Sequence, residues 1–299
     1  MLGLLCSERF GGMSTLELQD ARCLLVPDTK QLTIQDLLLM KTLHNLVASV
    51  EGQWLNFMIK EQRLITYFQP IVEVYNPNNI LAYECLIRGQ ELDGTITYPD
   101  RMFSIAKAAD TLFQLDRSAR ITAIRDATKC NLQQKVFINF IPAAIYDPSF
   151  CLRTTVAAIE QSCMKNEQFV FEVVESEDID DITHLLKILE FYRSNGFQVA
   201  LDDLGAGYSS LNLLHKIRPD YIKLDRELVH GVDVDPYKAQ ISAMLLSLAN
   251  ELGIKTIAEG VETVGEWQWL QENGTEYVQG YLFARPSQEP GIASVPVTG

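Results

Sequence analysis

The sequence predicts an α/β fold in which eight strands and the helices between them form a (β/α)8 barrel of the TIM type. Three observations predict it. Short runs rich in apolar, β-branched and aromatic residues recur from residue 65 onward, separated by longer amphipathic stretches. Eight such runs within about 220 residues are typical of a closed barrel rather than an open sheet. Most runs also carry a polar residue near their C-terminal end, where such barrels place functional groups.

The elements follow one another in a regular order along the chain. The predicted strands are residues 65–69, 81–86, 136–140, 169–174, 198–202, 221–224, 254–258 and 277–281. Amphipathic spacing predicts helices between them, the clearest at 102–130, 183–195 and 237–252. After Arg285 and Pro286 the residues are small and polar, which predicts a loose tail.

A further helix is predicted before the barrel, over residues 33–60. Apolar residues recur there at intervals of four, three and four residues and form one stripe: Leu39, Leu43, Leu46 and Val50. We expect this stripe to pack on the domain that follows, as most such stripes do. A signalling or dimerisation helix is the alternative, although barely two heptads give weak support for a coiled coil.

Composition narrows the classes of function. The 39 acidic and 25 basic side chains give a net charge of −14, which argues against a general nucleic-acid binder. A small anionic ligand held through metal ions stays compatible with that charge. No apolar run approaches the roughly 18 residues of a membrane span, so none is expected. The six cysteines are scattered without a C-x-x-C pair, which disfavours a zinc cage and predicts a cytoplasmic protein.

Polar side chains gather at the ends of the predicted strands. They are Glu84, Asn139, Glu172, Asp202, Asp203, Lys223, Glu259 and Gln279. Any one of them has an ordinary explanation, such as a cap or a salt bridge at the rim of the barrel. Five carboxylates that converge on one mouth would repel one another without compensation. Together these residues therefore indicate a functional site.

The chemistry of this set points to metal ions. Its ligand atoms are all oxygen, and oxygen-only sites suit Mg²⁺ or Mn²⁺. The carboxylates exceed the number that one Mg²⁺ usually takes, whereas two ions bridged by a carboxylate would absorb the charge. Two-ion sites typically cut phosphate esters, and Lys223 is suited to hold the attacking water or a phosphate oxygen. A glycosidase with two carboxylates is the alternative, but the surplus of acids argues against it.

Eight short motifs occur along the chain. They are YFQPIV (67–72), YECLIRG (83–89), INFIP (138–142), FEVVESE (171–177), DDLGAGYSSL (202–211), YIKLDREL (221–228), IAEGVET (257–263) and VQGYLFARP (278–286). In this order they resemble the EAL-domain phosphodiesterases of bacterial cyclic-di-GMP signalling, over residues 52–287. The resemblance implies a modified TIM barrel with one antiparallel strand, a mostly helical N-terminal extension (1–51) and a flexible tail (288–299).

The same resemblance implies an activity. Its members hydrolyse cyclic-di-GMP to linear pGpG with two Mg²⁺ or Mn²⁺ ions, and they commonly form homodimers near the loop after the fifth strand. The alternative is a catalytically weak cyclic-di-GMP receptor or a protein-interaction domain. Members of that kind usually lack one or more metal ligands, whereas this chain keeps every ligand position.

Individual residues take roles from the resemblance. The metal ligands are Glu84, Asn139 and Glu172 for the first ion, Asp202 as the bridge, and Asp203 and Glu259 for the second. The catalytic positions are Glu84, Glu259, Lys223, which orients the attacking water, and Glu175, which anchors the loop after the fifth strand. The substrate-binding positions are Gln69, Leu86, Arg88, which faces a phosphate, Pro142, Asp225, Gln279 and Pro286.

Two positions depart from the family's motifs. Cys85 replaces the alanine of Glu-Ala-Leu, and on a strand it alternates away from the face that holds Glu84 and Leu86. We expect little catalytic effect from this change. Leu204 replaces a more common phenylalanine, which is expected to affect how the following loop packs.

Overall fold

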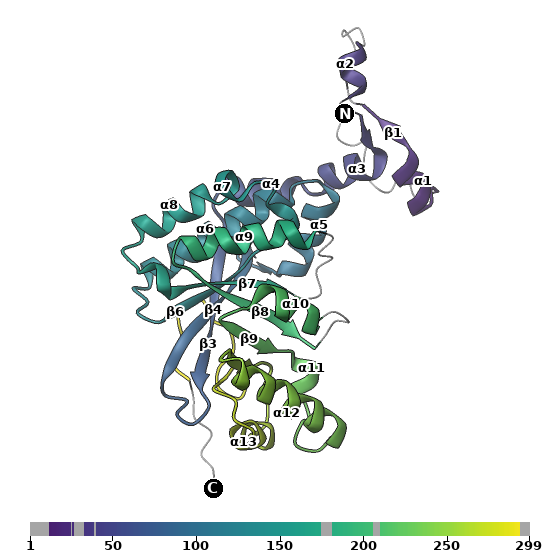
Figure 1. Ribbon diagram of the computed structural model, residues 1–299. Coiled ribbons are helices and arrows are strands. Elements are labelled where there is room, and N and C mark those ends of the chain that lie inside the picture. The colour runs from purple at the N-terminus through teal and green to yellow at the C-terminus, as the bar shows by residue number, and fades with distance from the viewer. Residues whose placement is uncertain are drawn as a thin grey trace. The chain divides into compact units, whose positions relative to one another are not determined.

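The computed structural model describes residues 12–24, 26, 33–38, 40–174, 181–205 and 210–293 (Figure 1). The chain divides into two compact units, one of residues 1–64 and 88–118 and the other of residues 65–87 and 119–299. The second unit carries most of the predicted site. The predicted domain boundaries at residues 51 and 287 stay a prediction.

The first unit is built from short elements. They are α1 (Thr15–Asp20), β1 (Arg22–Cys23), α2 (Ile34–Leu37), β2 (Lys41–Thr42), α3 (Leu43–Glu51), α4 (Gln53–Lys60), β5 (Ile96–Thr97) and α5 (Pro99–Ala108). Strands β1 and β2 pair in antiparallel orientation. Helix α1 begins with a capping box, in which the Ser14 hydroxyl accepts the N–H of Glu17 and the Glu17 carboxylate accepts the N–H of Ser14.

The continuous helix predicted over 33–60 is divided in the structure. Thr42 ends β2 and caps α3, since its hydroxyl accepts the N–H of Asn45 over 3.1 Å. Helices α3 and α4 then meet at Gly52, where a Cβ would lie only 2.7 Å from Cγ2 of Ile105. Glycine is therefore required for the close approach at this break. Leu39 of the predicted stripe lies outside the described residues.

The helix predicted over 102–130 is also divided, into α5 and α6 (Leu112–Lys129). Asp110 adopts the left-handed region with a φ of 61°. The N–H of Thr111 donates to the carbonyl of Ala106 over 2.8 Å and closes the last turn of α5. Apolar periodicity continues across this break, so the pattern alone predicted one helix.

Eight strands form the barrel. They are β3 (Leu64–Glu73), β4 (Ile80–Gln90), β6 (Lys135–Asn139), β7 (Phe169–Val174), β8 (Gln198–Leu204), β9 (Tyr221–Leu224), β10 (Lys255–Ala258) and β11 (Tyr277–Val278). Neighbours pair in the order β3-β11-β10-β9-β8-β7-β6-β4, and a further pairing of β3 with β4 closes the ring. Strand β3 runs antiparallel to β11, whereas the pairs from β4 through β11 are parallel. The predicted modified barrel with one antiparallel strand is confirmed.

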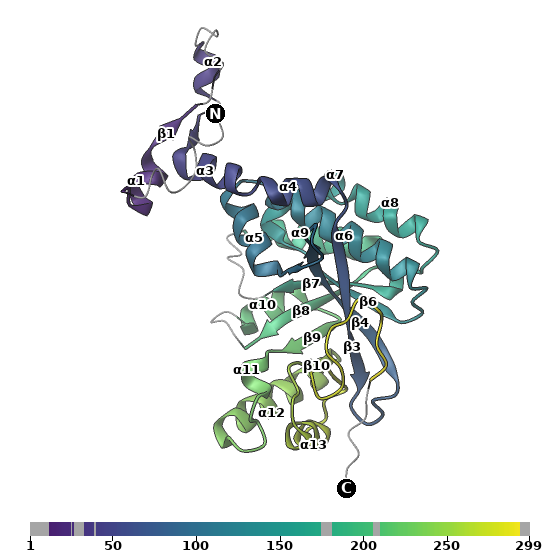
Figure 2. The same cartoon turned by 180° about the vertical axis from the view of Figure 1, so that it is seen from behind.

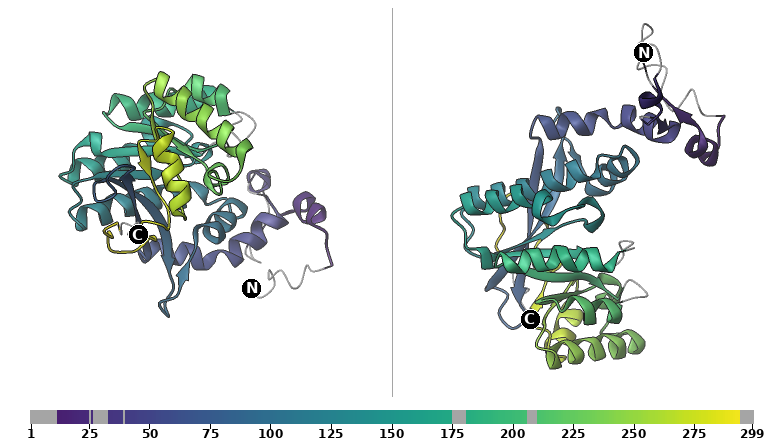
Figure 3. Two further views of the ribbon diagram at one scale, coloured as in Figure 1. Left: turned by 90° about the horizontal axis from the view of Figure 1, so that it is seen from below. Right: turned by 45° about the horizontal axis from the view of Figure 1, so that its top comes forward.

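Helices surround the strands of the second unit. They are α7 (Pro148–Cys151), α8 (Arg153–Gln161), α9 (Ile182–Ser194), α10 (Ser210–Ile217), α11 (Arg226–Val229), α12 (Pro236–Glu251) and α13 (Val264–Glu272), with the 3₁₀ turns η3 (Pro142–Ala144) and η4 (Asn166–Gln168). Figures 2 and 3 show α9, α10 and α12 outside the sheet. In the part of the chain that the structure describes, no helix has the length and apolarity to cross a membrane.

Candidate active site

Core residues and site residues alternate along the barrel strands. A buried inner layer takes one residue from each of seven strands: Ile71, Ala82, Phe137, Val170, Ala200, Tyr221 and Ile257. In the parallel strands a predicted site residue follows two positions later, on the same face: Glu84, Asn139, Glu172, Asp202, Lys223 and Glu259. In the antiparallel β3 the order is reversed, and Gln69 precedes Ile71 by two positions. The site residues thus form the next layer of the barrel.

Lys223 lies at the centre of this layer and is fully buried. Its Nζ contacts one carboxylate from each of four elements: Glu259 Oε1 at 2.6 Å, Glu172 Oε1 at 2.8 Å, Asp202 Oδ1 at 3.0 Å and Glu84 Oε1 at 3.5 Å. These ion pairs offset part of the cost of burying the charges. One ammonium cannot balance four carboxylates, so the layer keeps an excess of acidic groups.

Two side-chain amides hold the carboxylates in place. Gln279, which follows β11, donates from Nε2 to Glu84 Oε2 over 2.5 Å and to Gln69 Oε1 over 3.1 Å. Asn139 donates from Nδ2 to Glu172 Oε2 over 3.2 Å and to Glu84 Oε1 over 3.4 Å. Glu84 is therefore fixed from two sides, which leaves fewer rotamers to order when a ligand arrives.

A β-bulge brings two consecutive acids into the layer. Between the pairs Leu201–Ile222 and Leu204–Leu224, strand β8 contains one residue more than β9. The extra residue lies at Asp203, whose φ of 56° is in the left-handed region. In a regular strand Asp202 and Asp203 would point to opposite faces. The bulge places both carboxylates in the same cavity.

The carboxylates form two overlapping clusters. One oxygen each from Glu84, Glu172 and Asp202 lies within 4.8 Å of the others, and so does one oxygen each from Asp202, Asp203 and Glu259. Asp202 belongs to both clusters. A pair of metal ions bridged by one carboxylate needs donors in such an arrangement.

The acidity of these groups is shifted by their surroundings. Burial raises the pKa of Glu172 and of Glu259 well above that of an ordinary glutamate; Lys223 opposes the rise, and Glu84 and Asp202 add to it. Burial also raises the pKa of Asp203, together with the charge of Asp202, to about 7. For Lys223, burial alone would lower the pKa, but the four carboxylates outweigh it and hold the pKa well above its ordinary value. A divalent cation would relieve this crowding of negative charge.

The donor chemistry fits hard divalent cations. The two clusters offer carboxylate oxygens, and the Asn139 side chain beside them adds an amide group. Neither cluster contains a histidine or cysteine. This set suits Mg²⁺ or Mn²⁺ rather than zinc or copper.

A cavity of about 300 Å³ opens onto the carboxylates. Its lining includes seven residues of the predicted site: Gln69, Glu84, Leu86, Asp202, Asp203, Glu259 and Gln279. Glu172 and Lys223 are fully buried beneath them. The structure thus brings the predicted metal ligands and Lys223 together in one place.

Other predicted residues do not line this cavity. Pro142 is buried at the start of η3, and Asp225 caps α11 by accepting the N–H of Glu227 over 2.8 Å. Pro286 is half-buried. In the first unit, the guanidinium carbon of Arg88 lies 5.1 Å from the centre of the Tyr98 ring. Glu175 lies outside the described residues.

Sequence reasoning missed a basic residue in the cavity wall. Arg226 lines the cavity, and its Nη2 lies 2.9 Å from Glu262 Oε1. The Arg226 stem covers Gly260, where a Cβ would lie 2.4 Å from Cγ of the arginine. Its only signal in the sequence was its place directly after Asp225 in the motif YIKLDREL.

Sequence reasoning also missed a buried glutamate beneath the wall. Glu266 is 1% exposed and accepts backbone N–H groups of Gly231 at 2.9 Å, Glu262 at 2.9 Å and Thr263 at 3.0 Å. These bonds fix the segment that carries Glu262. The spacing Thr263-x-x-Glu266 matches a capping box, a signal that could have identified this residue.

Comparison with known proteins places this geometry in a family. The model of the EAL domain matches residues 53–286. The probable cyclic di-GMP phosphodiesterase PdeG of Escherichia coli strain K12 is 31% identical over 235 residues, which are 76% of this chain and 45% of PdeG. The chain thus spans less than half the length of that relative.

Solved structures agree with this match. A standalone versatile EAL protein from Vibrio cholerae O395, in its c-di-GMP bound form, is 36% identical with a TM-score of 0.70, covering 77% of this chain and 95% of that one. Klebsiella pneumoniae BlrP1, in a complex with manganese and cyclic-di-GMP, is 34% identical with a TM-score of 0.69, covering 76% and 56%. The chain belongs to the EAL domain family.

Proposed function

We propose that this protein is a phosphodiesterase that hydrolyses cyclic-di-GMP to linear pGpG with two Mg²⁺ or Mn²⁺ ions. The observation that carries the proposal is the pair of carboxylate clusters that share Asp202 and surround Lys223. The names of PdeG and of the cyclic-di-GMP complexes support the choice of substrate. The activity lowers the level of a bacterial second messenger.

The residues of the layer divide between the two ions. Glu84, Asn139, Glu172 and Asp202 would hold the first ion, and Asp202, Asp203 and Glu259 would hold the second. Bound there, the ions neutralise the phosphate and make water a stronger nucleophile near neutral pH. Manganese in the BlrP1 complex supports a divalent ion of this kind.

Hydrolysis adds one water molecule across one phosphodiester bond. The water oxygen bonds to phosphorus, the bond from phosphorus to one ribose oxygen breaks, and that oxygen leaves with a proton. Lys223 donates to the attacking water or to a phosphate oxygen. Its ammonium is suited to this role because it is fully buried among the metal ligands, which hold it in place. The other phosphodiester stays intact, so the product is linear.

The remaining site residues orient the substrate. Gln69, Leu86 and Gln279 line the cavity beside Glu84 and define its walls. We assign Arg88 to a phosphate of the substrate, and Pro142, Asp225 and Pro286 to further contacts with it. We assign Glu175 the role of anchoring the loop after the fifth strand of the barrel.

The decisive test is metal-dependent cleavage. Wild-type protein with Mg²⁺ or Mn²⁺ should convert cyclic-di-GMP to pGpG, and chromatography measures the product. Chelation of the metal should stop the reaction. Glu84→Ala should abolish turnover because it removes a metal ligand, whereas Glu272→Ala, on the exposed end of α13, should cleave like the wild type. Wild-type protein that binds cyclic-di-GMP but releases no pGpG with either metal would instead be a receptor.

A homodimer is the second part of the proposal. On α12, Tyr237, Ile241 and Met244 recur at intervals of four and three residues and are 83%, 48% and 65% exposed. An apolar stripe of this kind on a helix surface is typical of a protein interface. Light scattering should give twice the mass of one chain, and Met244→Asp should shift it toward the mass of one chain.

A further inference from the structure

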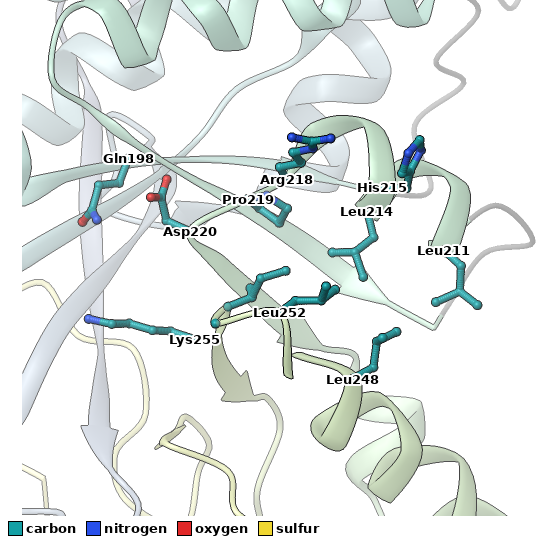
Figure 4. A pocket seen from close by; sticks show the side chains of 12 residues that line it. Gln198, Leu211, Leu214, His215, Arg218, Pro219, Asp220, Leu248, Leu252 and Lys255 are labelled. Carbon is teal, nitrogen blue, oxygen red and sulfur yellow. The ribbon is translucent and has the colours of Figure 1, made fainter. Parts of the chain in front are cut away.

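A second cavity lies at the opposite end of the barrel. Its volume is about 750 Å³, and it opens where β8, β9 and β10 begin (Figure 4). Its lining comes from the starts of these strands and from α10 and the C-terminal end of α12. The carboxylate clusters stand at the other ends of the same strands, so this cavity has no part in the proposed cleavage.

Two helix ends shape one side of this cavity. Helix α10 ends before Arg218, which has a φ of 48°, and α12 ends before Gly253, which has a φ of 68°. Both residues occupy the left-handed region that terminates helices. A Cβ at Gly253 would have no atom within 4 Å, so the space beside it is open. Both helices therefore end at the rim of the cavity, and the space between their ends stays open.

Leucines from the two helices form an apolar wall. Leu211 and Leu214 come from α10, and Leu248 and Leu252 come from α12 and its C-terminal cap. Leu211 is 57% exposed and Leu252 is 58% exposed. A ligand with an apolar chain would remove this surface from water, which is the main source of affinity for such a wall.

The other end of the cavity is polar and basic. Figure 4 shows Gln198, Asp220 and Lys255 on the side away from the leucines. Lys135 adjoins them, since its Nζ donates to Gln198 Oε1 over 2.6 Å. Asp220, the only acid among the residues that line the cavity, already accepts the backbone N–H of Val199 over 2.8 Å.

The two lysines at this end repel each other. Burial lowers the pKa of Lys135, and the charge of Lys255 lowers it further, while Asp220 and Glu167 oppose the change. Arg218 also lines the cavity, beside His215 and Leu214 (Figure 4). The three basic side chains of Lys135, Lys255 and Arg218 thus exceed the two acids Asp220 and Glu167, in a chain whose net charge is −14. An anionic group placed between the lysines would relieve the repulsion.

We propose that this cavity binds an amphiphile with an unbranched apolar chain and one carboxylate, the chemistry of a medium-chain fatty acid. The chain lies along the leucine wall between α10 and α12, and the carboxylate meets Lys255 and Lys135. A neutral ligand would leave the repulsion between the lysines unrelieved, and a cationic one would add to their charge. Cavities of several hundred Å³ with apolar walls and few polar groups are typical of small-molecule sites.

The test is calorimetric titration of the full chain with sodium decanoate below its micelle concentration. Decyltrimethylammonium, which has the same chain and a cationic head, should bind at least about tenfold more weakly. Leu252→Asp and Lys255→Glu should each weaken decanoate binding by about tenfold or more. Lys187→Glu, on the exposed face of α9 and outside the lining, should bind like the wild type. Circular dichroism checks that each variant is folded.

Three results would overturn the proposal. The first is equal binding of decanoate and decyltrimethylammonium, which would mean that the basic end recognises nothing. The second is decanoate binding that Leu252→Asp and Lys255→Glu leave unchanged in folded protein. The third is that Leu252→Asp converts the protein from dimer to monomer but leaves its affinity for decanoate unchanged. That result would mean that a second copy of the chain covers the cavity. Because the readout is binding and not cleavage, none of these results bears on the phosphodiesterase proposal.

Discussion

Asp203 donates its backbone N–H to Oδ1 of Asp202 over 3.0 Å, and both carboxylates contribute to the cluster that includes Glu259. Two adjacent acids can share a site only because the bulge in β8 turns Asp203 into the left-handed region. The same Oδ1 of Asp202 lies 3.0 Å from Nζ of Lys223. This local distortion links the strand pairing of the barrel to the proposed metal site.

The bulge predicts a difference between two substitutions at Asp203. Asn tolerates the left-handed region, so Asp203→Asn should keep the bulge and melt close to the wild type. The Asp203→Asn variant loses a charged metal ligand, which stabilises the transition state by several kcal/mol. The rate of cyclic-di-GMP cleavage should therefore fall by at least about 100-fold. Asp203→Val should also be destabilised by about 1–3 kcal/mol, because a β-branched residue is strained at this φ.

Thermal unfolding and pGpG formation measured on both variants check this prediction. Equal melting temperatures for Asn and Val at position 203 would mean that the left-handed conformation is not retained in solution. Cleavage by Asp203→Asn at the wild-type rate would remove Asp203 from the metal ligands.

The ion pairs of Lys223 predict that the free energy of unfolding depends on bound metal. In the presence of EDTA, Lys223→Met leaves four carboxylates without their shared ammonium, and the free energy of unfolding should fall by about 3–5 kcal/mol. Mn²⁺ should restore part of the loss, because the ions supply positive charge to the same oxygens. Urea unfolding with and without Mn²⁺ measures both effects.

The matched control is Lys187→Met, on the exposed face of α9. It should change the free energy of unfolding by less than about 0.5 kcal/mol, with or without metal. If Lys223→Met lost no more stability than this control in EDTA, the buried ion pairs would not be holding the cluster together.

The strand alternation made much of this arrangement predictable from the residues. Apolar runs with a polar residue at the end predicted the barrel strands, and the site layer follows the core layer at a spacing of two residues. The type and the order of the strands and helices could be predicted because they depend on such local patterns. The predicted donors therefore lie together even though they come from strands far apart in the chain.

Features that depend on contacts between distant segments were not predictable. The bulge at Asp203 arises from the register between β8 and β9, and the sequence of either strand alone does not determine that register. The break at Gly52 reflects the approach of Ile105, which lies in another helix. Glu266 carries a capping-box signal, but its bond to the N–H of Gly231 joins residues 35 positions apart.

Gly280 predicts a steric limit at the wall of the active-site cavity. A Cβ there would lie 2.1 Å from the carbonyl oxygen and 2.3 Å from the nitrogen of Val261, both backbone atoms. Gly280→Ala should therefore lower the free energy of unfolding by about 1–3 kcal/mol. It should also slow cleavage, because the adjacent Gln279 holds Glu84.

Gly291→Ala is the control for that substitution, since its Cβ would meet only Ser287 Oγ at an ordinary 3.6 Å. Denaturant unfolding and pGpG formation compare the two variants. A Gly280→Ala protein as stable and active as Gly291→Ala would show that the segments at 261 and 280 are not closely packed in solution.

Glu266 predicts a pH-dependent contribution to stability. Burial by itself would raise the pKa of this carboxyl, but the hydrogen bonds from Gly231, Glu262 and Thr263 outweigh it and lower the pKa below the ordinary 4.5. A group whose pKa is lowered by folding stabilises the protein above its unfolded pKa, and the stabilisation is lost as the pH falls through the folded pKa. Glu266→Gln should therefore cost about 1.5–3 kcal/mol at pH 7, because an amide offers one acceptor oxygen to donors that bind both carboxylate oxygens.

The difference between wild type and Glu266→Gln should shrink as the pH falls below 4.5, where the wild-type carboxyl also takes up a proton. Urea unfolding from pH 7 to pH 3 measures this difference. Glu272→Gln, on the exposed end of the same helix, should give a curve parallel to the wild type throughout. A constant gap between Glu266→Gln and wild type over the whole range would mean that the charge of Glu266 does not stabilise the segment beneath the cavity wall, and that only its shape does.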